Sequence, residues 1–510
     1  MVLKLLRKKS TEEAHSFNQI SSNQTSKDQF TKIEALDSDQ SLENEPIVID
    51  KQVEKRVLRK LDIFVVTWFA IFYFFCQLDR SNIGFAQTDG FIDDIGLKGN
   101  EFGNANSYLY ITYLTFEPIN TLIVKKVTPK YLMIGCAFAW GLTTLSQAFI
   151  QNAGGLYACR LVMGLFESGI LPVIYVLTST IYTKSEKTKR HSFVYFIAAF
   201  ASAFGGLLAY GLLRVTGPKH LEEGWRIMFF VEGLMTIGVL PLAIFIFPKN
   251  FETSWFFNEE EKKCYAQRLI HYPELYEKDD FKWSVVWDMF KDFKFYAEVI
   301  WQFCCVLSFF ASSTFLPTIV SSMGYEGIKS NLMVVPIYMY GAIYYIIVAT
   351  LSDYFKNRSI FMAISALAML IGYIIIYASK KDGVRYFGCF FMIMGVYPGT
   401  GLNMMWLGDN LPSHYQKAAY MGFTMALGNT AGLAYGQVFR DNDAPRYQNG
   451  IKVGLALTAV ALVDVLIQIG YYKYLNNKKL KALEEAERQG TPLEEQPELH
   501  DKNPHYLYTF

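Results

Sequence analysis

The sequence predicts an all-α membrane protein with twelve transmembrane helices in two halves of six. The 510 residues are 52% hydrophobic and 16% aromatic but only 19% charged, whereas a soluble chain of this length would have several domains with charge interspersed. The charge is concentrated toward the two ends of the chain. Between them lie twelve apolar runs of about 20 residues, each long enough to cross roughly 30 Å of hydrocarbon as a helix.

The order of these runs predicts five parts. Residues 1–60 are expected to be a disordered cytoplasmic tail, because their polar composition cannot offset the entropy of ordering. Residues 61–247 hold six spans, 248–298 form a polar central loop, 299–472 hold six more, and 473–510 form a C-terminal tail. The predicted spans are 62–87, 104–125, 131–150, 155–182, 191–213, 226–247, 299–320, 331–352, 359–379, 385–408, 418–438 and 451–472.

The central loop is predicted to carry a short surface helix that links the two bundles. Asn258 is placed to cap it, Glu259, Glu260 and Glu261 fall in its positive first turn, and Arg268 lies near its end.

The placement of lysine and arginine orients the chain. The loops after spans two, four and eight are basic, which is typical of the cytoplasmic side. Both tails are therefore expected in the cytoplasm, and the plasma membrane is the expected location. A net charge of +1 without a dominant basic tract indicates no nucleic-acid partner. The basic loop residues are Lys125, Lys126 and Lys130; Lys184, Lys187, Lys189 and Arg190; and Lys356 and Arg358.

Ionisable residues inside spans are costly and mark candidate functional positions. Asp79 and Arg80 interrupt span one, unless the helix ends at Leu78 and leaves both at the interface. Glu117 precedes Pro118 in span two, and a purely structural role for it is as well supported as a functional one.

Span four contains Arg160 and Glu167, two helical turns apart and therefore on one face. A buried carboxylate that faces a cation suits reversible protonation, because burial and the cation act on its pKa in opposite directions. A fixed ion pair is the alternative. Glu232 in span six is interpreted as structural, and no role is assigned to Asp464 in span twelve.

Small residues recur every fourth position in the corresponding spans five and eleven, which favours close helix packing. They are Ala198, Ser202 and Gly206, and Gly428, Gly432 and Gly436.

Several motifs occur in order along residues 60–475. They are Leu78 to Gly84, Glu117-Pro118 with Asn120, Arg160 with Gly164, Glu167 and Pro172, Phe204 to Gly211, Gly224-Trp225-Arg226 with Glu232-Gly233, Gly428-Asn429, and Asp443 to Tyr447 with Gly450. With these motifs the chain resembles the major facilitator transporters and, among them, the fungal allantoate permease branch of the anion:cation symporters. The loop after span eight fits that superfamily with Asp353, Lys356 and Arg358, whereas the loop after span two lacks the usual acidic residue.

The resemblance implies proton-driven uptake of a small organic anion, such as an allantoate-, nicotinate- or cysteine-like carboxylate. It implies that Asp79 and Glu167 carry protons and that Arg80 and Arg160 hold the anion. Further substrate contacts are expected from Glu117, Asn120, Trp406, Asn410 and Asn429. No cofactor or metal is expected beyond the proton gradient, the partners are the anion, protons and the bilayer, and a monomer is expected to function.

Two other functions remain open at this point. A proton-independent facilitator would not need both Asp79 and Glu167, and a nutrient sensor on a transporter scaffold would usually carry longer cytoplasmic extensions. A membrane enzyme is disfavoured, because the seven histidines lie in tails, loops or span ends and no nucleotide-binding glycine motif is present.

Overall fold

A computed structural model describes residues 49–123, 127–272, 283–325, 327–412, 414–440, 443, 446–489 and 501–510. The chain divides into two compact units, Met1–Glu54 and Lys55–Phe510. Of the first unit, residues 49–54 are described, and they include the start of helix α2. Residues 1–48 of the predicted disordered tail lie outside the described residues.

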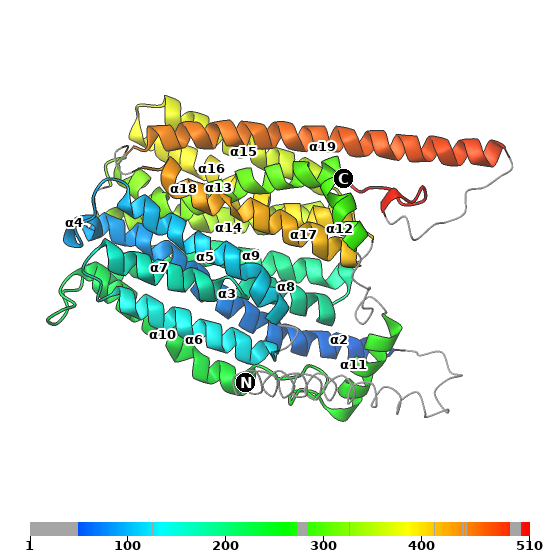
Figure 1. Ribbon diagram of the computed structural model, residues 1–510, viewed down its shortest axis with the longest axis horizontal. Coiled ribbons are helices and arrows are strands. Elements are labelled where there is room, and N and C mark those ends of the chain that lie inside the picture. Colours follow the sequence, from blue (N-terminus) through cyan, green and yellow to red (C-terminus); the bar gives the residue numbers. More distant parts are fainter. Residues whose placement is uncertain are drawn as a thin grey trace, which may run out of the picture. The chain divides into compact units, whose positions relative to one another are not determined.

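The described regular structure is helical throughout (Figure 1). The elements are α2 (Lys51–Leu61), η1 (Asp62–Val66), α3 (Thr67–Ala86), η2 (Gln87–Asp89), α4 (Phe91–Asp94), α5 (Glu101–Ile123), α6 (Pro129–Gln147), α7 (Ala153–Glu167), α8 (Ile170–Ile181), α9 (Lys184–Leu212), α10 (Gly224–Ile246), α11 (Glu259–His271), α12 (Trp283–Phe290), α13 (Phe293–Ser321), α14 (Lys329–Phe355), α15 (Arg358–Ala378), α16 (Asp382–Asp409), α17 (His414–Asn429), α18 (Ala431–Val438) and α19 (Gln448–Arg488).

These helices confirm the predicted fold class of twelve spans. Eight helical stretches in the described chain are long and apolar enough to cross a membrane. The remaining four spans are α5, α6, α16 and the pair α17 and α18. The first three carry more polar residues, and the last is interrupted between α17 and α18. Span four is likewise divided, into α7 and α8. Inside a bilayer the helix is favoured because it satisfies every backbone polar group within the segment.

Helix α2 corrects the prediction that disorder extends to residue 60. Val57 and Leu61, one turn apart, are fully buried, and the Lys60 ammonium donates to Glu261 at 2.6 Å and to the Phe256 carbonyl at 2.8 Å. The polar composition hid a short apolar stripe at helical spacing. At the other end, α19 continues past the predicted boundary at residue 472 without a break, to Arg488.

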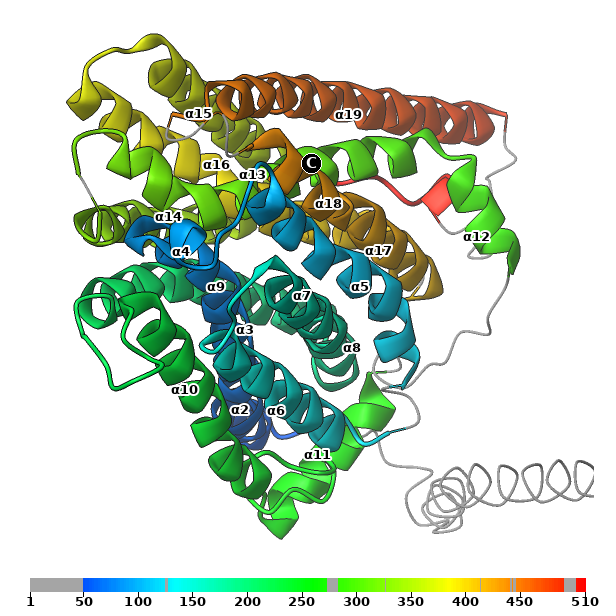
Figure 2. The same cartoon turned by 60° about the vertical axis from the view of Figure 1, so that its left-hand side comes forward.

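Two bundles, α3–α10 and α13–α19, meet along pairs of helices. The pairs are α3 with α13, α5 with α18, and α9 with α14 (Figure 2). The predicted small-residue faces lie at these contacts: a Cβ on Gly436 would be 2.3 Å from the Gly103 carbonyl oxygen, and one on Gly206 would be 2.7 Å from that of Asn331. Small residues therefore let the two halves approach through their backbones.

The halves are bonded mainly at the end of the bundle that carries α4, called here the α4 end. Gln87 donates to Tyr447 at 3.0 Å, Asn331 to Thr88 at 2.9 Å, and Asn100 to Gln437 at 2.7 Å. At the opposite end, called the α11 end, Ser192 of α9 contacts the Met405 sulfur of α16 at 3.8 Å. The structure is thus a state in which the α4 end is sealed.

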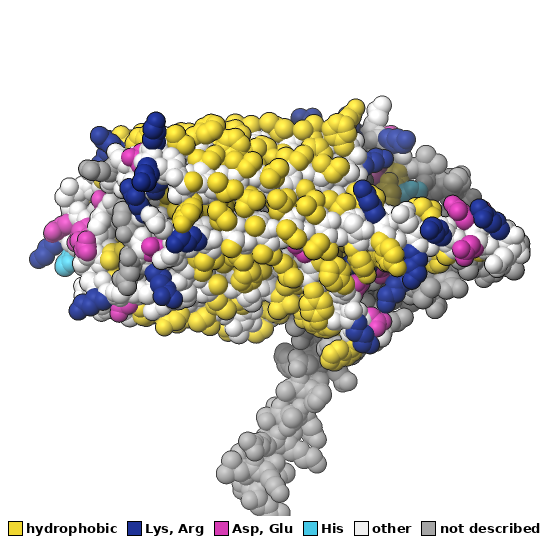
Figure 3. All heavy atoms as spheres, turned by 90° about the horizontal axis from the view of Figure 1, so that it is seen from above, with side chains coloured by type: hydrophobic (Ala, Val, Ile, Leu, Met, Phe, Trp, Pro, Cys, Tyr) yellow, Lys and Arg dark blue, Asp and Glu magenta, His cyan; other side chains and the backbone are white. Residues whose placement is uncertain are grey.

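The surface is consistent with a lipid environment. Figure 3 shows apolar side chains covering the middle of the visible face, with lysine, arginine and acidic residues gathered toward the two ends. Exposed large apolar residues occur on several spans, among them Phe138, Leu242, Phe245, Ile347 and Val463. Such a continuous apolar surface is rare on soluble monomers and marks contact with lipid or protein.

Candidate functional site

The centre of the candidate site is an ion pair between two spans. The Arg80 Nε on α3 lies 2.5 Å from Glu167 Oε2 on α7, and their side chains are 9% and 0% exposed. Helix α3 runs unbroken through Asp79 and Arg80, so the alternative in which span one ends at Leu78 is wrong. The other carboxylate oxygen of Glu167 has no hydrogen-bond partner within the described chain. It is therefore free to hold a proton or accept a further donor.

Arg160 lies two turns before Glu167 on α7 and therefore on the same face of that helix. Its side chain is 1% exposed, and its Nη1 donates to the Met163 sulfur at 3.6 Å. Nε and Nη2 have no hydrogen-bond partner among the described residues. Because a guanidinium stays protonated when buried, Arg160 presents two unused donors that suit an anion.

Aromatic rings surround these charges. The Arg80 guanidinium lies over the Tyr113 ring, 4.7 Å from its centroid. Tyr110 is 4.3 Å from Phe310 and 5.8 Å from Tyr435, measured between ring centroids. These rings come from both halves and form a tilted cluster, with interplanar angles of 40° between Tyr110 and Phe310 and 87° between Tyr110 and Tyr435, so an apolar aromatic cluster lies beside the cations.

Further predicted residues lie at two helix breaks, one between α7 and α8 and one between α17 and α18. Glu167 is the last residue of α7 and Asn429 the last of α17. The Asn429 amide donates to Glu117 Oε2 at 3.5 Å, across the boundary between the halves. Asn120 donates to the Ser168 hydroxyl at 2.7 Å, at the break between α7 and α8. Broken helices inside a membrane occur where they are buried in protein or line a cavity.

Asp79 lies apart from Arg80, inside the N-terminal bundle. Its Oδ2 accepts hydrogen bonds from the Trp140 indole and the Thr236 hydroxyl, both at 3.1 Å. The side chains of adjacent residues on a helix point about 100° apart, so Asp79 and Arg80 face different neighbours. Asp79 belongs to the packing of α3 against α6 and α10.

Trp406 and Asn410 lie at the α11 end rather than beside Arg80 and Glu167. The Trp406 indole donates to the Thr509 carbonyl at 2.9 Å, and the Asn410 amide donates to the same oxygen at 3.1 Å. The Asn410 amide also donates to the Trp406 carbonyl at 3.1 Å, so both side chains bond to the C-terminal segment and not to the ion pair.

Sequence reasoning missed the aromatic residues around the ion pair. Tyr113 is one helical turn before Glu117, so helical spacing could have placed it on the same face. Glu232, interpreted as structural, is fully buried, and neither carboxylate oxygen has a hydrogen-bond partner in the described chain. A small apolar cavity inside the C-terminal half, lined by Leu316, Tyr373 and Phe439 among others, includes none of the predicted site residues.

The fold and the site together define a class: a polytopic helical carrier whose two halves enclose buried charges. A family model described as Major Facilitator Superfamily matches residues 69–436. The chain belongs to the major facilitator superfamily. It is a multi-pass membrane transporter of a small molecule, and its family and relatives are transporters rather than enzymes.

Its relatives include fungal members of that family. The chain is 35% identical to the "High-affinity nicotinic acid transporter" of Saccharomyces cerevisiae, over 90% of this chain and 85% of that protein. It is 30% identical to the "Major facilitator-type transporter hxnP" of Emericella nidulans, over 85% and 89%. These relatives agree with the resemblance to the fungal anion:cation symporters.

A solved proton:xylose symporter of the same superfamily shares the fold. Its TM-score is 0.64 at 12% identity, and the match covers 81% of this chain and 96% of that one.

Proposed function

We propose that the protein is a proton-coupled symporter that takes up a small organic anion bearing a carboxylate. The observation that carries this proposal is the buried pair between Arg80 and Glu167 at 2.5 Å, next to the two unused guanidinium donors of Arg160. A buried cation whose partner acid can be protonated is a site where proton and anion binding are linked.

The proposed cycle uses that linkage. While Glu167 is ionised it satisfies Arg80, and an incoming anion gains little. When Glu167 takes up a proton, the Arg80 guanidinium is released, and its planar fork matches the geometry of a carboxylate. Arg160 then supplies a second fixed positive charge. Linkage is reciprocal, so the bound anion in turn raises the proton affinity of Glu167.

The rings around the site favour an aromatic carboxylate. An aromatic acid can make an edge-to-face contact with the cluster of Tyr110, Phe310 and Tyr435, whose centroids are 4.3–5.8 Å from one another, while its carboxylate meets the arginines. Nicotinate, which the name of the yeast relative specifies, is such a compound. We therefore take nicotinate as the first substrate to test, ahead of allantoate- and cysteine-like acids.

We further propose that both tails and the central loop face the cytoplasm, that the protein resides in the plasma membrane, and that the monomer is functional. The basic residues Arg56, Lys60 and Arg190 gather at the α11 end with α2 and α11, which supports a cytoplasmic position for that end.

The test is uptake of labelled nicotinate by cells that lack their own carrier. We expect uptake to rise at acidic external pH, to collapse with a protonophore, and to be inhibited by unlabelled nicotinate but not by nicotinamide. Nicotinamide is the matched control, since it keeps the ring and replaces the carboxylate with a neutral amide. Uptake insensitive to the protonophore would favour a facilitator, and equal inhibition by nicotinamide would contradict anion recognition.

A further inference from the structure

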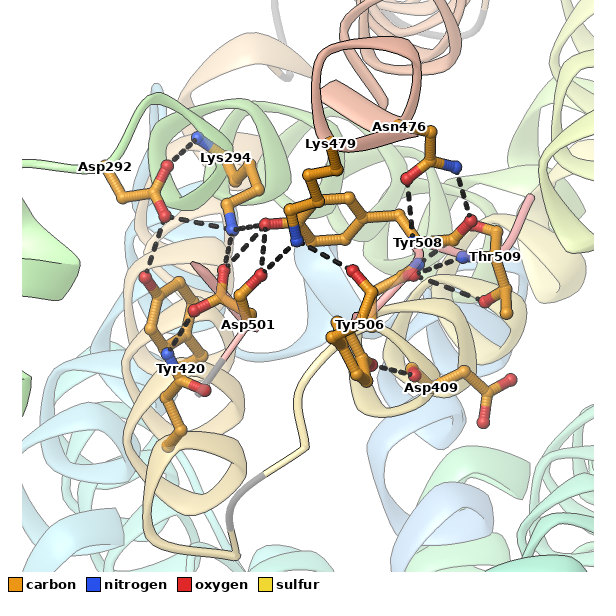
Figure 4. Close-up of polar contacts among 12 residues, drawn as sticks. Asp292, Lys294, Asp409, Tyr420, Asn476, Lys479, Asp501, Tyr506, Tyr508 and Thr509 are labelled. Carbon is orange, nitrogen blue, oxygen red and sulfur yellow. Dashed lines mark hydrogen bonds and ion pairs between the residues drawn. The ribbon is translucent and has the colours of Figure 1, made fainter. Parts of the chain in front are cut away.

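The last ten residues form a docked segment on the C-terminal bundle, residues 501–510, called here the C-terminal latch (Figure 4). Its anchor is Asp501, 1% exposed, which pairs with the ammonium of Lys294 on α13. Asp501 also accepts a hydrogen bond from Gln416 of α17 at 2.8 Å. Burial would raise the pKa of Asp501, but the charge and hydrogen bond of Lys294 outweigh it and lower that pKa. The latch is therefore held by a charged pair.

The rest of the latch follows with matched hydrogen bonds. Asn476 of α19 donates to the Tyr508 carbonyl and accepts from the Tyr508 amide, both at 2.9 Å. Asn410 of α16 accepts from the Thr509 amide at 2.7 Å, and Tyr506 donates to the Asp409 carbonyl at 2.8 Å (Figure 4). Side chains from α19 and from the end of α16 thus bond to backbone groups of the latch, and a latch side chain bonds to the backbone at the end of α16.

The receiving surface contains buried groups that the latch satisfies. Lys294 is 7% exposed, Trp406 0% and Asn410 2%. A buried cation or indole N–H without a partner is costly. Each of these three side chains contacts the latch. Lys294 also pairs with Asp292 at 3.2 Å and Asn410 also donates to the Trp406 carbonyl at 3.1 Å, so among the described contacts it is the Trp406 indole that depends on the latch alone. Three such contacts on buried groups indicate a built binding site.

The latch also reaches the place where the two halves meet at this end. Its Phe510 oxygen accepts from the backbone N–H of Arg358 at 2.6 Å. The Arg358 side chain pairs with Asp409 at 2.6 Å and contacts the Met405 sulfur at 3.6 Å. Met405 is the residue that Ser192 of the N-terminal half contacts. The latch is thus connected, through Arg358 and Met405, to the place where α9 contacts α16 at the α11 end.

We infer that the C-terminal latch is an autoinhibitory device: docked on α13, α16, α17 and α19, it favours the state with the α4 end sealed and slows the return to the opposite state. Transport requires alternation between the two states, and stabilising one of them lowers the population of the other. The conformational readout below does not depend on the proposed substrate, whereas the uptake readout does.

The test uses the full chain with Asp501→Ala, which removes the anchor. Lys502→Ala, at an exposed neighbouring position, is the matched control. The double variant Lys294→Asp with Asp501→Lys reverses the ion pair and distinguishes loss of docking from general misfolding. Three quantities are measured: amide exchange at Tyr508 and Thr509, thiol labelling of a Ser107→Cys reporter between α5 and α18 at the α4 end, and Vmax and KM for nicotinate.

In Asp501→Ala we expect about tenfold faster amide exchange in the latch, which corresponds to ~1.4 kcal/mol. We also expect faster labelling at position 107 and a Vmax raised about twofold or more, with KM unchanged. The reversed pair should restore docking in part, because the carboxylate at position 294 would then face Asp292, a partner of Lys294 at 3.2 Å, and Lys502→Ala should match wild type.

Two results would overturn the inference: unchanged exchange in Asp501→Ala, or a freed latch with labelling at position 107 unchanged or slower. Absence of nicotinate uptake in the wild type would instead contradict the proposed substrate, and the labelling would still decide the role of the latch.

Discussion

At the scale of single residues, two carboxylates on the predicted site have different surroundings. Glu167 faces Arg80, whereas Asp79 is held by Trp140 and Thr236 within one bundle. We therefore predict that Glu167→Gln abolishes nicotinate accumulation but spares exchange, because exchange needs binding without net proton movement. Asp79→Asn should retain proton-driven accumulation with reduced thermal stability. Accumulation that survives in Glu167→Gln and fails in Asp79→Asn would reverse the assignment.

Arg80 is predicted to act through the shape of its guanidinium as well as its charge. It bonds Glu167 and lies over Tyr113 at once, and an ammonium cannot reproduce that planar contact. Arg80→Lys should raise the KM for nicotinate by about tenfold or more, equivalent to ~1.4 kcal/mol. The comparison variant is Arg214→Lys, whose parent residue stacks on Tyr210 away from the site. Equal effects of the two changes would show that Arg80 has no special role.

At the scale of elements, α11 is fastened to the N-terminal bundle by one bidentate pair. Arg268, fully buried, donates to Glu186 at 3.0 and 2.5 Å. Burial would raise the pKa of Glu186, but hydrogen bonds and the charge of Arg268 outweigh it and lower that pKa below the ordinary 4.5. A lowered folded-state pKa means that the stabilisation is complete above pH 4.5 and is lost as pH falls through the folded value.

The prediction is that amide protection of α11 stays constant from pH 7 to 5 and falls only at more acidic pH. Glu186→Gln should weaken that protection already at pH 7, since removing one partner of a buried pair costs about 3–5 kcal/mol. Exchange measured by mass spectrometry reports it, with α10 as the internal reference. A gradual loss of α11 protection between pH 7 and 5 would contradict the proposed anchor.

The contact between α5 and α18 depends on glycines, which have no side chain to keep the two backbones apart. A Cβ on Gly436 would lie 2.3 Å from the Gly103 carbonyl oxygen, whereas one on Gly211 meets nothing within 4 Å. Gly436→Ala should therefore open the α4 end, speed labelling of Ser107→Cys and lower uptake severalfold. Gly211→Ala should leave both unchanged. Normal uptake by Gly436→Ala would show that this close approach is not required in the cycle.

At the scale of the whole molecule, the proposed topology places both ends of the chain in the cytoplasm. A protease added outside intact cells should leave an N-terminal tag and a tag inserted after Arg488, at the end of α19, uncleaved. Cleavage should require permeabilisation of the membrane. A tag cut in intact cells would overturn the assigned orientation.

The sequence by itself determined the fold class. A lipid bilayer permits only helices or closed β-barrels to span it, and twelve apolar runs of helix-spanning length indicate a bundle of twelve helices. The sequence also pointed to Asp79, Arg80, Arg160 and Glu167 as candidates, since charges in apolar helices are visible without coordinates. Asn258 was readable as a helix cap, and its side chain does accept from the Glu261 amide at 2.8 Å. These features are local, and local rules suffice for them.

Only the tertiary structure decided which charges meet. Glu167 could pair with Arg160 on its own helix, yet it pairs with Arg80 from another span, because the arrangement of α3 and α7 in the bundle sets that distance. The same holds for Trp406 and Asn410, whose partner Thr509 is about a hundred residues away. Side-chain pairing between spans depends on helix rotation and depth, which no spacing within one helix records.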